Sequence, residues 1–236
     1  AAVAAQAGLR CVLVANGRRP DPLTGNALLV SLLGAEVHYV ETREERAPAM
    51  ARIAEALRRE GRHPYEIPLG ASTPLGALGF VRAVGEMAAQ GVVPDVIVHA
   101  TSSGGTQAGL VAGCALHGLP TRVLGISADD PAPSVRGAVA GIIAGMGPLL
   151  GVDGEALALA RPIDVDAAHV GGGYGVPSPA SLEAADLFAR LEALFADHTY
   201  TAKALAGLVH HIRCGAFTAG QTVLFWHTGG QAGLFA

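Results

Sequence analysis

DVIVHATSSGGTQAGL, residues 95–110, decides the fold of this chain, because it reads as a buried strand, a glycine-rich loop and the first turns of a helix. We expect the strand at residues 95–99 and the helix to continue to His117, and the apolar segment RVLGI at residues 122–126 predicts the next strand. A strand, a crossing helix and a second strand at this spacing are typical of a parallel sheet covered by helices. The sequence therefore predicts an α/β fold with three layers, α/β/α, around a mainly parallel sheet.

The same alternation of strands and helices runs along the rest of the chain. The other predicted elements are helices at residues 1–8, 26–33, 47–60 and 182–195 and strands at residues 10–14, 36–40 and 223–228. The composition changes near residues 68–74 (PLGASTP), which is the best candidate for a domain boundary. We therefore expect a small α/β lobe at residues 1–67 and a large α/β domain at residues 68–236, with a ligand cleft between them.

The composition excludes one class of protein at once. Of the 236 residues, 50% are hydrophobic and 15% are charged, against about 25% charged residues in an average soluble domain. The net charge is −4, and the 16 lysines and arginines are spread thinly along the chain. Because nucleic-acid binding needs a basic surface, we expect no nucleic-acid partner.

Two long uncharged stretches, residues 137–152 and 215–236, raise the question of a membrane. The first is interrupted by Pro148 and is shorter than the roughly 20 residues of a spanning helix, and the second carries polar side chains that are costly in hydrocarbon. We read both as buried elements and expect no membrane partner. The three cysteines are an odd number and lie far apart, which favours a reducing compartment, the cytoplasm, over a disulfide framework.

The glycine-rich loop contains the residues best suited to bind an anion: Ser102, Ser103, Gly104, Gly105 and Thr106. Its glycines let backbone N–H groups turn inward, its hydroxyls add donors, and the start of the following helix carries partial positive charge. The loop matches neither GxGxxG nor GxxxxGK[ST], so neither a dinucleotide nor a triphosphate is indicated. From the loop alone, a phosphate site and an ordinary strand–helix turn fit equally well.

Three further loops carry candidate site residues. Tyr174 lies among the glycines of residues 171–175, residues 197–203 (DHTYTAK) enter a helix, and Thr228 precedes Gly-Gly at the end of the last predicted strand. We expect all of these loops at the carboxyl ends of strands, where open α/β sheets bind ligands. The nine histidines show no HExxH spacing and no GxSxG occurs, so the sequence predicts neither a metal site nor a nucleophile elbow.

Taken together, the stretches of sequence resemble one family, the pyridoxal-phosphate enzymes related to 1-aminocyclopropane-1-carboxylate (ACC) deaminase and D-cysteine desulfhydrase. The stretches that carry the resemblance, in the family's order, are AAVAAQAGLRCVLV, GNALLVSLLGAEV, SSGGTQAGL, YGVPSP, YTAKALAGL and WHTGG. The resemblance covers essentially the whole chain. It implies the tryptophan-synthase-β fold, known as fold type II, with pyridoxal 5'-phosphate as cofactor, a small amino acid as substrate and a homodimer as the assembly.

The resemblance also implies roles for individual residues. The cofactor-phosphate loop of the family matches Ser103, Gly104, Gly105 and Thr106. Tyr174 and Tyr200 match two active-site tyrosines near substrate and cofactor. Thr201 stands where the family places the partner of the pyridine nitrogen, and Thr228 lies in the loop that closes on the same edge of the ring.

Thr201 and Thr228 also separate two activities within this family. Deaminases that resemble this chain carry a glutamate and a leucine at these positions, and the carboxylate deepens the electron sink that opens a cyclopropane. A neutral hydroxyl gives a shallower sink, which suffices to expel a thiolate. We therefore expect β-elimination of D-cysteine to pyruvate, ammonia and sulfide. Departures from the family beside the site, at His198, Thr199 and Ala202, leave ACC, L-cysteate or another β-substituted amino acid as alternatives.

Lys203 is the single lysine of the chain, and enzymes of this family need a lysine that forms the Schiff base with the cofactor. It falls where the family has a second, non-catalytic lysine. We expect the Schiff-base lysine upstream of Ala1, so that the chain is a fragment and is inactive as it stands; Lys203 as the Schiff-base lysine is the alternative. A non-catalytic binding protein that kept the fold is a further alternative.

Overall fold

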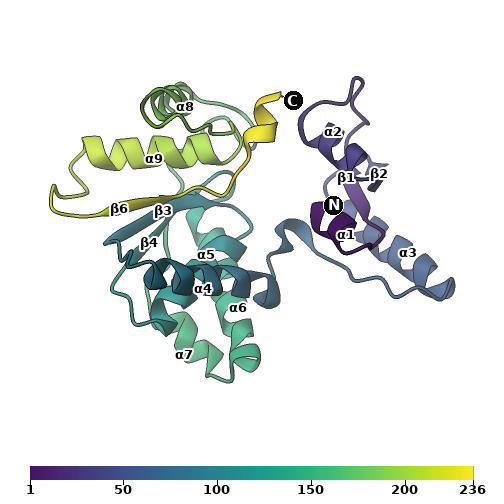
Figure 1. Cartoon of the computed structure of the whole chain (residues 1–236), viewed down its shortest axis with the longest axis horizontal. Helices are drawn as coiled ribbons and strands as arrows, with labels where there is room; N and C mark the ends of the chain where they lie inside the picture. Colours follow the sequence, from purple (N-terminus) through teal and green to yellow (C-terminus); the bar gives the residue numbers. More distant parts are fainter. Residues whose placement is uncertain (236) are drawn as a thin grey trace. The chain divides into compact units, whose positions relative to one another are not determined.

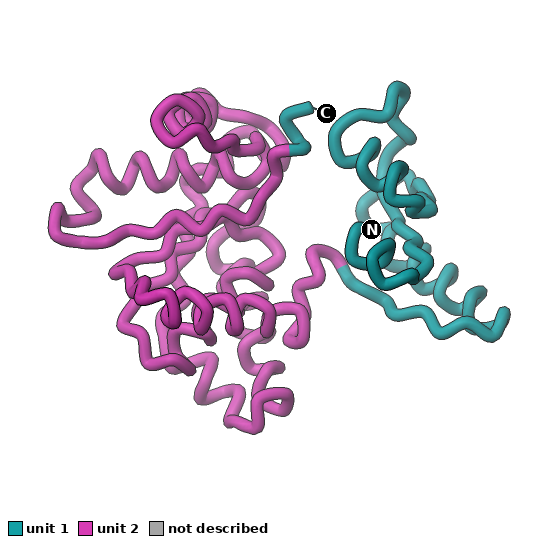
Figure 2. Tube along the Cα trace, viewed as in Figure 1, with its two compact units in different colours: residues 1–68, 232–236 teal, residues 69–231 magenta. Residues whose placement is uncertain are grey.

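The chain folds into two units, each of which has its own sheet (Figure 2). A computed structural model describes residues 1–235. The first unit comprises Ala1–Pro68 and a short C-terminal piece that begins at Ala232, and the second comprises Leu69–Gln231.

The first unit is built around two parallel strands, β1 (Val12–Asn16) and β2 (Glu36–Val40), which pair from Val12 opposite Glu36 to Asn16 opposite Val40. Its helices are α1 (Ala2–Gln6), α2 (Gly25–Leu32) and α3 (Arg46–Arg59). Helix α3 is amphipathic and buries Ala49 and Ala54. The C-terminal 3-10 helix η2 spans Gln231–Phe235.

The second unit contains a four-stranded parallel sheet in the order β5-β4-β3-β6. The strands are β3 (Val96–Thr101), β4 (Arg122–Ser127), β5 (Asp164–Asp166) and β6 (Val223–Trp226). Strand β3 pairs with β4 along its whole length, from Val96 opposite Arg122 to Thr101 opposite Ser127. Because β3 lies between β4 and β6, the loops that follow these three strands leave from the same edge.

Helices cover both faces of this sheet (Figure 1). One face carries α4 (Pro74–Ala89), α5 (Gly105–Leu116), α6 (Ala132–Leu150) and α7 (Gly154–Leu159), and the other carries α8 (Pro179–Glu192) and α9 (Thr201–Arg213). Side chains of β3 alternate between the two layers: Ile97 packs in the α4–α7 cluster, whereas Val96 and Val98 pack with α9. The predicted three-layer α/β/α fold with a parallel sheet is confirmed.

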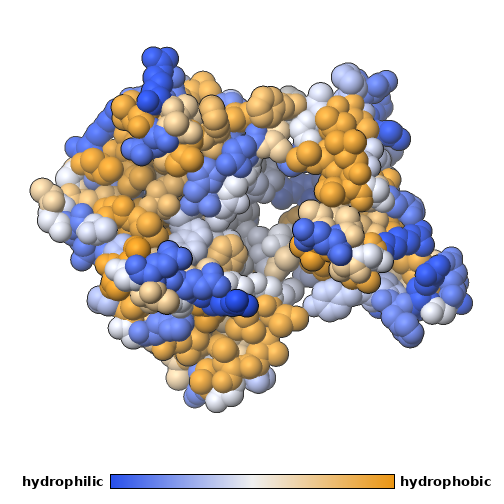
Figure 3. Space-filling model, viewed as in Figure 1, coloured by the Kyte–Doolittle hydropathy of each residue, from blue (hydrophilic) through white to orange (hydrophobic). Residues whose placement is uncertain are grey.

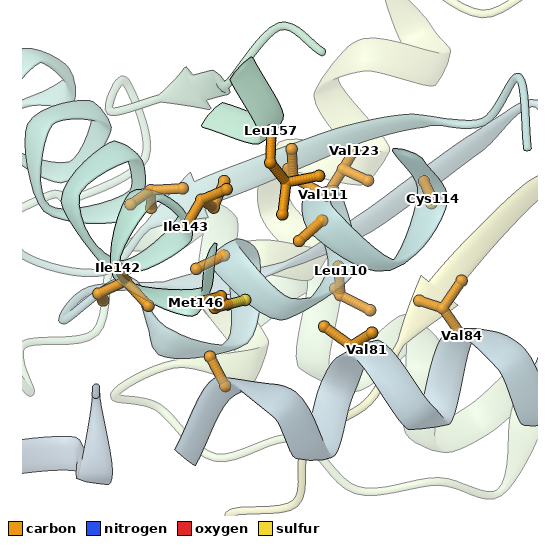
Figure 4. Packing of buried hydrophobic residues seen from close by; sticks show 14 of the residues in the cluster. Val81, Val84, Leu110, Val111, Cys114, Val123, Ile142, Ile143, Met146 and Leu157 are labelled. Atoms are coloured by element: carbon orange, nitrogen blue, oxygen red, sulfur yellow. The ribbon is translucent and has the colours of Figure 1, made fainter. Parts of the chain in front are cut away.

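Helices α4 and α5 pack closely because α5 presents glycines to α4. A Cβ at Gly109 would meet the carbonyl oxygen of Ala77, and a Cβ at Gly113 would lie 2.8 Å from Cβ and Cγ2 of Val84. In Figure 4, Val81 and Val84 of α4 point toward Leu110 of α5. This close approach holds α5, and therefore its first residues, in a fixed place on the sheet.

Helix α6 is the apolar segment that the sequence singled out, and one expectation about it is wrong. Pro148 does not interrupt the helix but lies inside its last turn, where it removes a single backbone N–H donor. The helix is long and apolar enough to cross a membrane by length and composition, yet Val139, Ile143 and Met146 are completely buried in the α4–α7 cluster. Hydrophobic residues are also exposed over α6 and α7 (Figure 3), among them Leu159.

We expect opposite effects from adding one methyl group at two helical glycines. Gly113→Ala overpacks the contact with Val84 and lowers the free energy of unfolding by about 1–3 kcal/mol. Gly137→Ala on α6, where nothing lies within 4 Å of the added Cβ, raises it by about 0.5–1 kcal/mol through the better helix propensity of alanine. Urea unfolding measures both, and equal effects of the two substitutions would show that α5 does not pack tightly on α4.

Candidate functional site

The glycine-rich loop joins the end of β3 to the start of α5 and has the geometry of an anion site. Gly104 precedes the helix with a left-handed backbone, φ +89°. The first helical hydrogen bond runs from Ala108 N–H to the carbonyl oxygen of Gly104 at 2.9 Å. The N–H groups of Thr106 and Gln107 come before that bond, so they are directed out of the helix start toward an anion.

Ser72 supports this loop from a segment 33 residues away. Its Oγ lies 2.7 Å from Oγ of Ser103 and accepts the N–H of Gly105 at 3.2 Å. A Cβ at Gly105 would lie 2.8 Å from the same oxygen, so this position requires glycine. Sequence reasoning missed Ser72, because it read residues 68–74 only as a change of composition.

A cavity of about 410 Å³ opens at this loop within the second unit. Its lining residues are Gly70, Ala71, Ser72, Gly76, Phe80, Ala100, Thr101, Ser102, Ser103, Gly104, Gly105, Thr106, Asp197, Tyr200, Thr228, Gly229 and Gly230. The structure thus brings the five predicted loop residues together with Tyr200 and Thr228. Tyr174, Thr201 and Lys203 do not belong to the lining.

Thr101 is a lining residue that the sequence did not single out. Its side chain is 3% exposed, and its hydroxyl has no hydrogen-bond partner among the described residues. Buried hydroxyl groups are nearly always paired in folded proteins. The hydroxyl of Thr101 is thus an orphaned polar group in a residue that lines the cavity, and a bound ligand is one partner that could satisfy it.

Asp197 organises the start of α9 and is buried in the same wall, with 4% of its surface exposed. Its Oδ1 accepts the N–H of Thr201 at 3.0 Å and the hydroxyl of Thr201 at 2.7 Å, and its Oδ2 accepts the N–H groups of Thr199 at 2.8 Å and Tyr200 at 2.9 Å. The four hydrogen bonds use the acceptor capacity of the carboxylate. Asp197 therefore acts as the cap that fixes Tyr200 and Thr201.

Residues 193–200 join α8 to α9, so this loop does not follow a strand, yet Asp197 and Tyr200 line the cavity together with the loop after β3. The loop reaches the cavity because α9 crosses the sheet and its first turn meets the carboxyl ends of the strands. Gly230 allows this approach, since a Cβ there would meet the carboxylate of Asp197. Thr201 lies behind Asp197 and is 1% exposed.

The two predicted site tyrosines contact each other. Their hydroxyl groups form a hydrogen bond, and their rings meet edge to face with centroids 5.6 Å apart. Tyr200 lines the cavity, whereas Tyr174 reaches it only through this bond. The pair can hold a proton at the cavity wall, because either oxygen can be the donor.

Thr228 stands two residues beyond β6, in a loop that lines the same cavity as Asp197 and Tyr200. The neighbouring His227 shapes this loop. Its Nδ1 accepts the N–H of Gly229 at 3.0 Å, so its Nε2 carries the proton and donates to the carbonyl oxygen of Phe195 at 2.9 Å. His227 thereby ties the loop of Thr228 to the α8–α9 connection.

Residues 1–229 match the profile of a family described as pyridoxal-phosphate dependent enzyme. The chain belongs to this family. ACC deaminase from Burkholderia cenocepacia is 36% identical over 252 residues, which cover 100% of this chain and 73% of the relative. ACC deaminase from Burkholderia vietnamiensis is 37% identical over 257 residues, with the same coverage.

Solved structures agree with this assignment. The crystal structure of an ACC deaminase homologue has a TM-score of 0.89 and 36% identity to the chain, and it matches over 99% of this chain and 70% of its own. O-ureido-L-serine synthase, with a TM-score of 0.63 and 18% identity over 94% of this chain and 66% of its own, shares the fold. The chain thus belongs to the ACC deaminase family of pyridoxal-phosphate enzymes and has the predicted fold type II.

The cavity of this chain fits the phosphate of that cofactor. The loop supplies N–H groups at a helix start, glycines whose Cβ atoms would meet Ser72 or Val139, and the hydroxyl groups of Ser102 and Ser103. The unpaired hydroxyl of Thr101 adds a donor that has no other use in the chain. The described lining residues include no lysine or arginine, so these groups would hold the phosphate through N–H and hydroxyl donors.

We expect Thr101→Val to separate stability from cofactor binding. The substitution removes a buried unpaired hydroxyl, so it raises the free energy of unfolding of the ligand-free chain by about 1 kcal/mol and weakens pyridoxal phosphate binding by roughly tenfold. Urea unfolding and quenching of the single tryptophan, Trp226, measure the two effects.

Thr121→Val is the matched control for Thr101→Val. Thr121 is 2% exposed, and its hydroxyl donates to the carbonyl oxygen of Pro94 at 2.6 Å. Its loss lowers stability by about 1–3 kcal/mol and leaves cofactor affinity unchanged. A Thr101→Val chain that is destabilised like this control, or that binds the cofactor as tightly as the parent chain, contradicts the assignment of Thr101 to the ligand.

Proposed function

We propose that the enzyme to which this chain belongs eliminates sulfide from D-cysteine and yields pyruvate and ammonia, with water consumed in the release of ammonia. The observation that supports this proposal is that Thr228 brings a neutral hydroxyl to the cavity, while the carboxylate of Asp197 in the same lining accepts four hydrogen bonds from the chain. Bound pyridoxal phosphate withdraws electrons from the Cα atom of an amino acid, and a charged partner of its ring nitrogen strengthens that withdrawal. The residue that hydrogen-bonds the ring nitrogen of the cofactor therefore influences which reaction the enzyme can catalyse.

Asp197 is the charged side chain in the cavity lining, and its carboxylate is already hydrogen-bonded within the chain. Its two oxygens accept four hydrogen bonds from the chain. The hydroxyl of Thr201 donates to Asp197 and accepts the N–H of Asp197 at 2.8 Å. Thr228 takes no part in these bonds and lies in the same lining as Asp197, and we assign its hydroxyl to the ring nitrogen. A neutral hydroxyl matches the departure of a good leaving group such as thiolate.

The remaining groups bind and orient the ligands in this proposal. Ser102, Ser103 and the N–H groups of Thr106 and Gln107 hold the phosphate at the start of α5. The Tyr174–Tyr200 hydroxyl pair holds a proton beside the substrate, where it can be delivered to the leaving sulfur. Lys203 stays outside this chemistry, because its Nζ is buried and bonded to two backbone carbonyl groups.

Deamination of ACC is the second candidate, and the names of the relatives at 36–37% identity favour it. The two reactions differ in the electron withdrawal that they need, since opening an unactivated ring has no good leaving group. They also release different keto acids, pyruvate from D-cysteine and 2-oxobutyrate from ACC. Product analysis therefore separates the two candidates directly.

We expect the protein translated from the complete reading frame that encodes this chain to release pyruvate from D-cysteine faster than 2-oxobutyrate from ACC. Thr228→Leu lowers kcat/KM for D-cysteine by roughly 10–100-fold, because it removes a hydrogen bond to the cofactor. Thr218→Leu on an exposed loop is the control and leaves the rate unchanged. Faster release of 2-oxobutyrate by the unmodified protein assigns the deaminase reaction instead.

We also expect that the chain of 236 residues does not bond covalently to the cofactor. Mixing it with pyridoxal phosphate and reducing with borohydride should leave Lys203 unlabelled, because its amine is 0% exposed and bonded to carbonyl groups. Mass spectrometry of the peptide that contains Lys203 measures this. Labelled Lys203 would establish it as the Schiff-base lysine.

We propose, together with this function, that the enzyme is cytoplasmic and forms a homodimer. Cys11, Cys114 and Cys214 are all unpaired in the structure. Burial raises the pKa of the Cys114 thiol to about 11, so it stays a protonated, unreactive group. A reducing compartment is compatible with these three thiols.

A further inference from the structure

Lys203 has the largest of the fully buried side chains in the described part of the chain. It is the third residue of α9, and its Nζ donates to the carbonyl oxygen of Ala128 at 3.0 Å and to that of Gly173 at 2.6 Å. Ala128 directly follows β4, and Gly173 belongs to the glycine-rich loop that carries Tyr174. A single ammonium group therefore joins three segments that are distant in sequence.

Burying the ammonium group of Lys203 costs desolvation free energy, and the groups that offset this cost indicate the role of the residue. Desolvation lowers the pKa of Lys203, while the charge of the nearby Asp129 opposes that shift. A buried ammonium persists only where hydrogen-bond acceptors replace its water. The acceptors are backbone carbonyl groups of two loops, so the favourable energy of the buried charge depends on where those loops lie.

The loop that carries Tyr174 is largely exposed. Tyr174 and Val176 are 47% and 46% exposed, and most residues of 171–177 are exposed. Within the loop, the carbonyl oxygen of Gly173 also accepts the N–H of Val176 at 3.2 Å. Lys203 thus holds the backbone of the loop one residue before Tyr174, and the hydroxyl of Tyr200 holds the end of its side chain.

We propose that Lys203 is a positioning residue, which holds Tyr174 against Tyr200 at the cavity by fixing the carbonyl group of Gly173. The inference rests on the proposed function only for the role of this tyrosine pair in the reaction. Both anchors leave from the same end of α9, Tyr200 just before the helix and Lys203 within its first turn. The start of α9 therefore fixes the position of the loop that carries Tyr174 and the position of Tyr200 in the cavity wall.

Chymotrypsin cleavage after Tyr174 tests this inference without substrate or cofactor. Lys203→Met keeps an apolar side chain in the core and removes the ammonium. We expect native-state cleavage at Tyr174 to rise at least about tenfold, because hydrogen bonds to a charged donor are lost. Leu205→Ala, at a position on the same helix that is 3% exposed, is the control: it weakens the core and leaves this local cleavage unchanged.

Chemical rescue distinguishes positioning from general loss of structure. Lys203→Ala leaves space for n-propylamine, which together with the Cβ of alanine reproduces the lysine side chain. We expect the amine to restore protection of Tyr174 and n-propanol, which lacks the charge, to leave it unprotected. Equal cleavage in Lys203→Met and Leu205→Ala, or protection restored by both additives, overturns the inference.

The unmodified chain provides a test that needs no variant to fold. Lys203 is the single lysine, so its acetylation can be followed at one site while cleavage at Tyr174 is followed in parallel as urea rises below the unfolding midpoint. If Lys203 holds the loop, both rates increase with the same dependence on urea. Cleavage that increases while Lys203 stays unreactive overturns the inference.

The reaction provides a separate readout in the protein from the complete reading frame. In a double-mutant cycle, Lys203→Met and Tyr174→Phe should lower kcat by less together than the product of their single effects, because both act through Tyr174. Additive losses overturn the inference. Inactivity toward D-cysteine, with cleavage and rescue as expected, rejects the proposed substrate and leaves the positioning role of Lys203 in place.

Discussion

The site depends first on the parallel pairing of β3 with both β4 and β6. The pairing of Val96 with both Arg122 and Val223 aligns the three strands at their amino ends. The segments that follow them consequently leave the sheet at one edge. Without this alignment the anion-binding loop after β3 and the Thr228 loop after β6 would not line one cavity, whatever residues they contained.

Small residues then decide how closely the helices approach that edge. Gly109 and Gly113 let α5 pack on α4 at distances that a Cβ would not permit. Gly105 lets the start of α5 approach Ser72 in the same way, and Gly230 makes room for the carboxylate of Asp197. The described residues that line the cavity include no lysine or arginine, so an anion there would depend on hydroxyl and backbone N–H groups, and the N–H groups are effective only when the backbone is held in place.

Much of this could be predicted from the sequence, since the strong signals are local. Strand β2 was expected at residues 36–40 and is observed there. Strand β3 extends past its expected end at residue 99 because Thr101 pairs with Ser127 in β4. Helix α8 begins before the expected residue 182 because Ser178 and Ser181 form a capping box. Such boundary differences come from partners that a local pattern does not contain.

The contacts that complete the site could not be predicted, because they join distant segments. Ser72 reaches Ser103, and Lys203 reaches Gly173, across about 30 residues of sequence in each case. Thr201 was expected to face the ligand as a neutral group, and its place behind Asp197 follows from the fold of the α8–α9 loop. Nothing in the segment DHTYTAK shows that its aspartate accepts hydrogen bonds from the N–H groups at the start of the following helix.

The two charged residues at the start of α9 are both satisfied by hydrogen bonds within the chain. The carboxylate of Asp197 is satisfied by N–H groups at the positive end of the helix and by the hydroxyl of Thr201. The ammonium of Lys203 is satisfied by the carbonyl groups of Ala128 and Gly173. Each charge is compensated mainly by the backbone, so both stabilise the architecture. Under the proposed function the hydroxyl of Thr228 meets the cofactor ring, and a neutral partner there favours chemistry in which the leaving group carries the negative charge away.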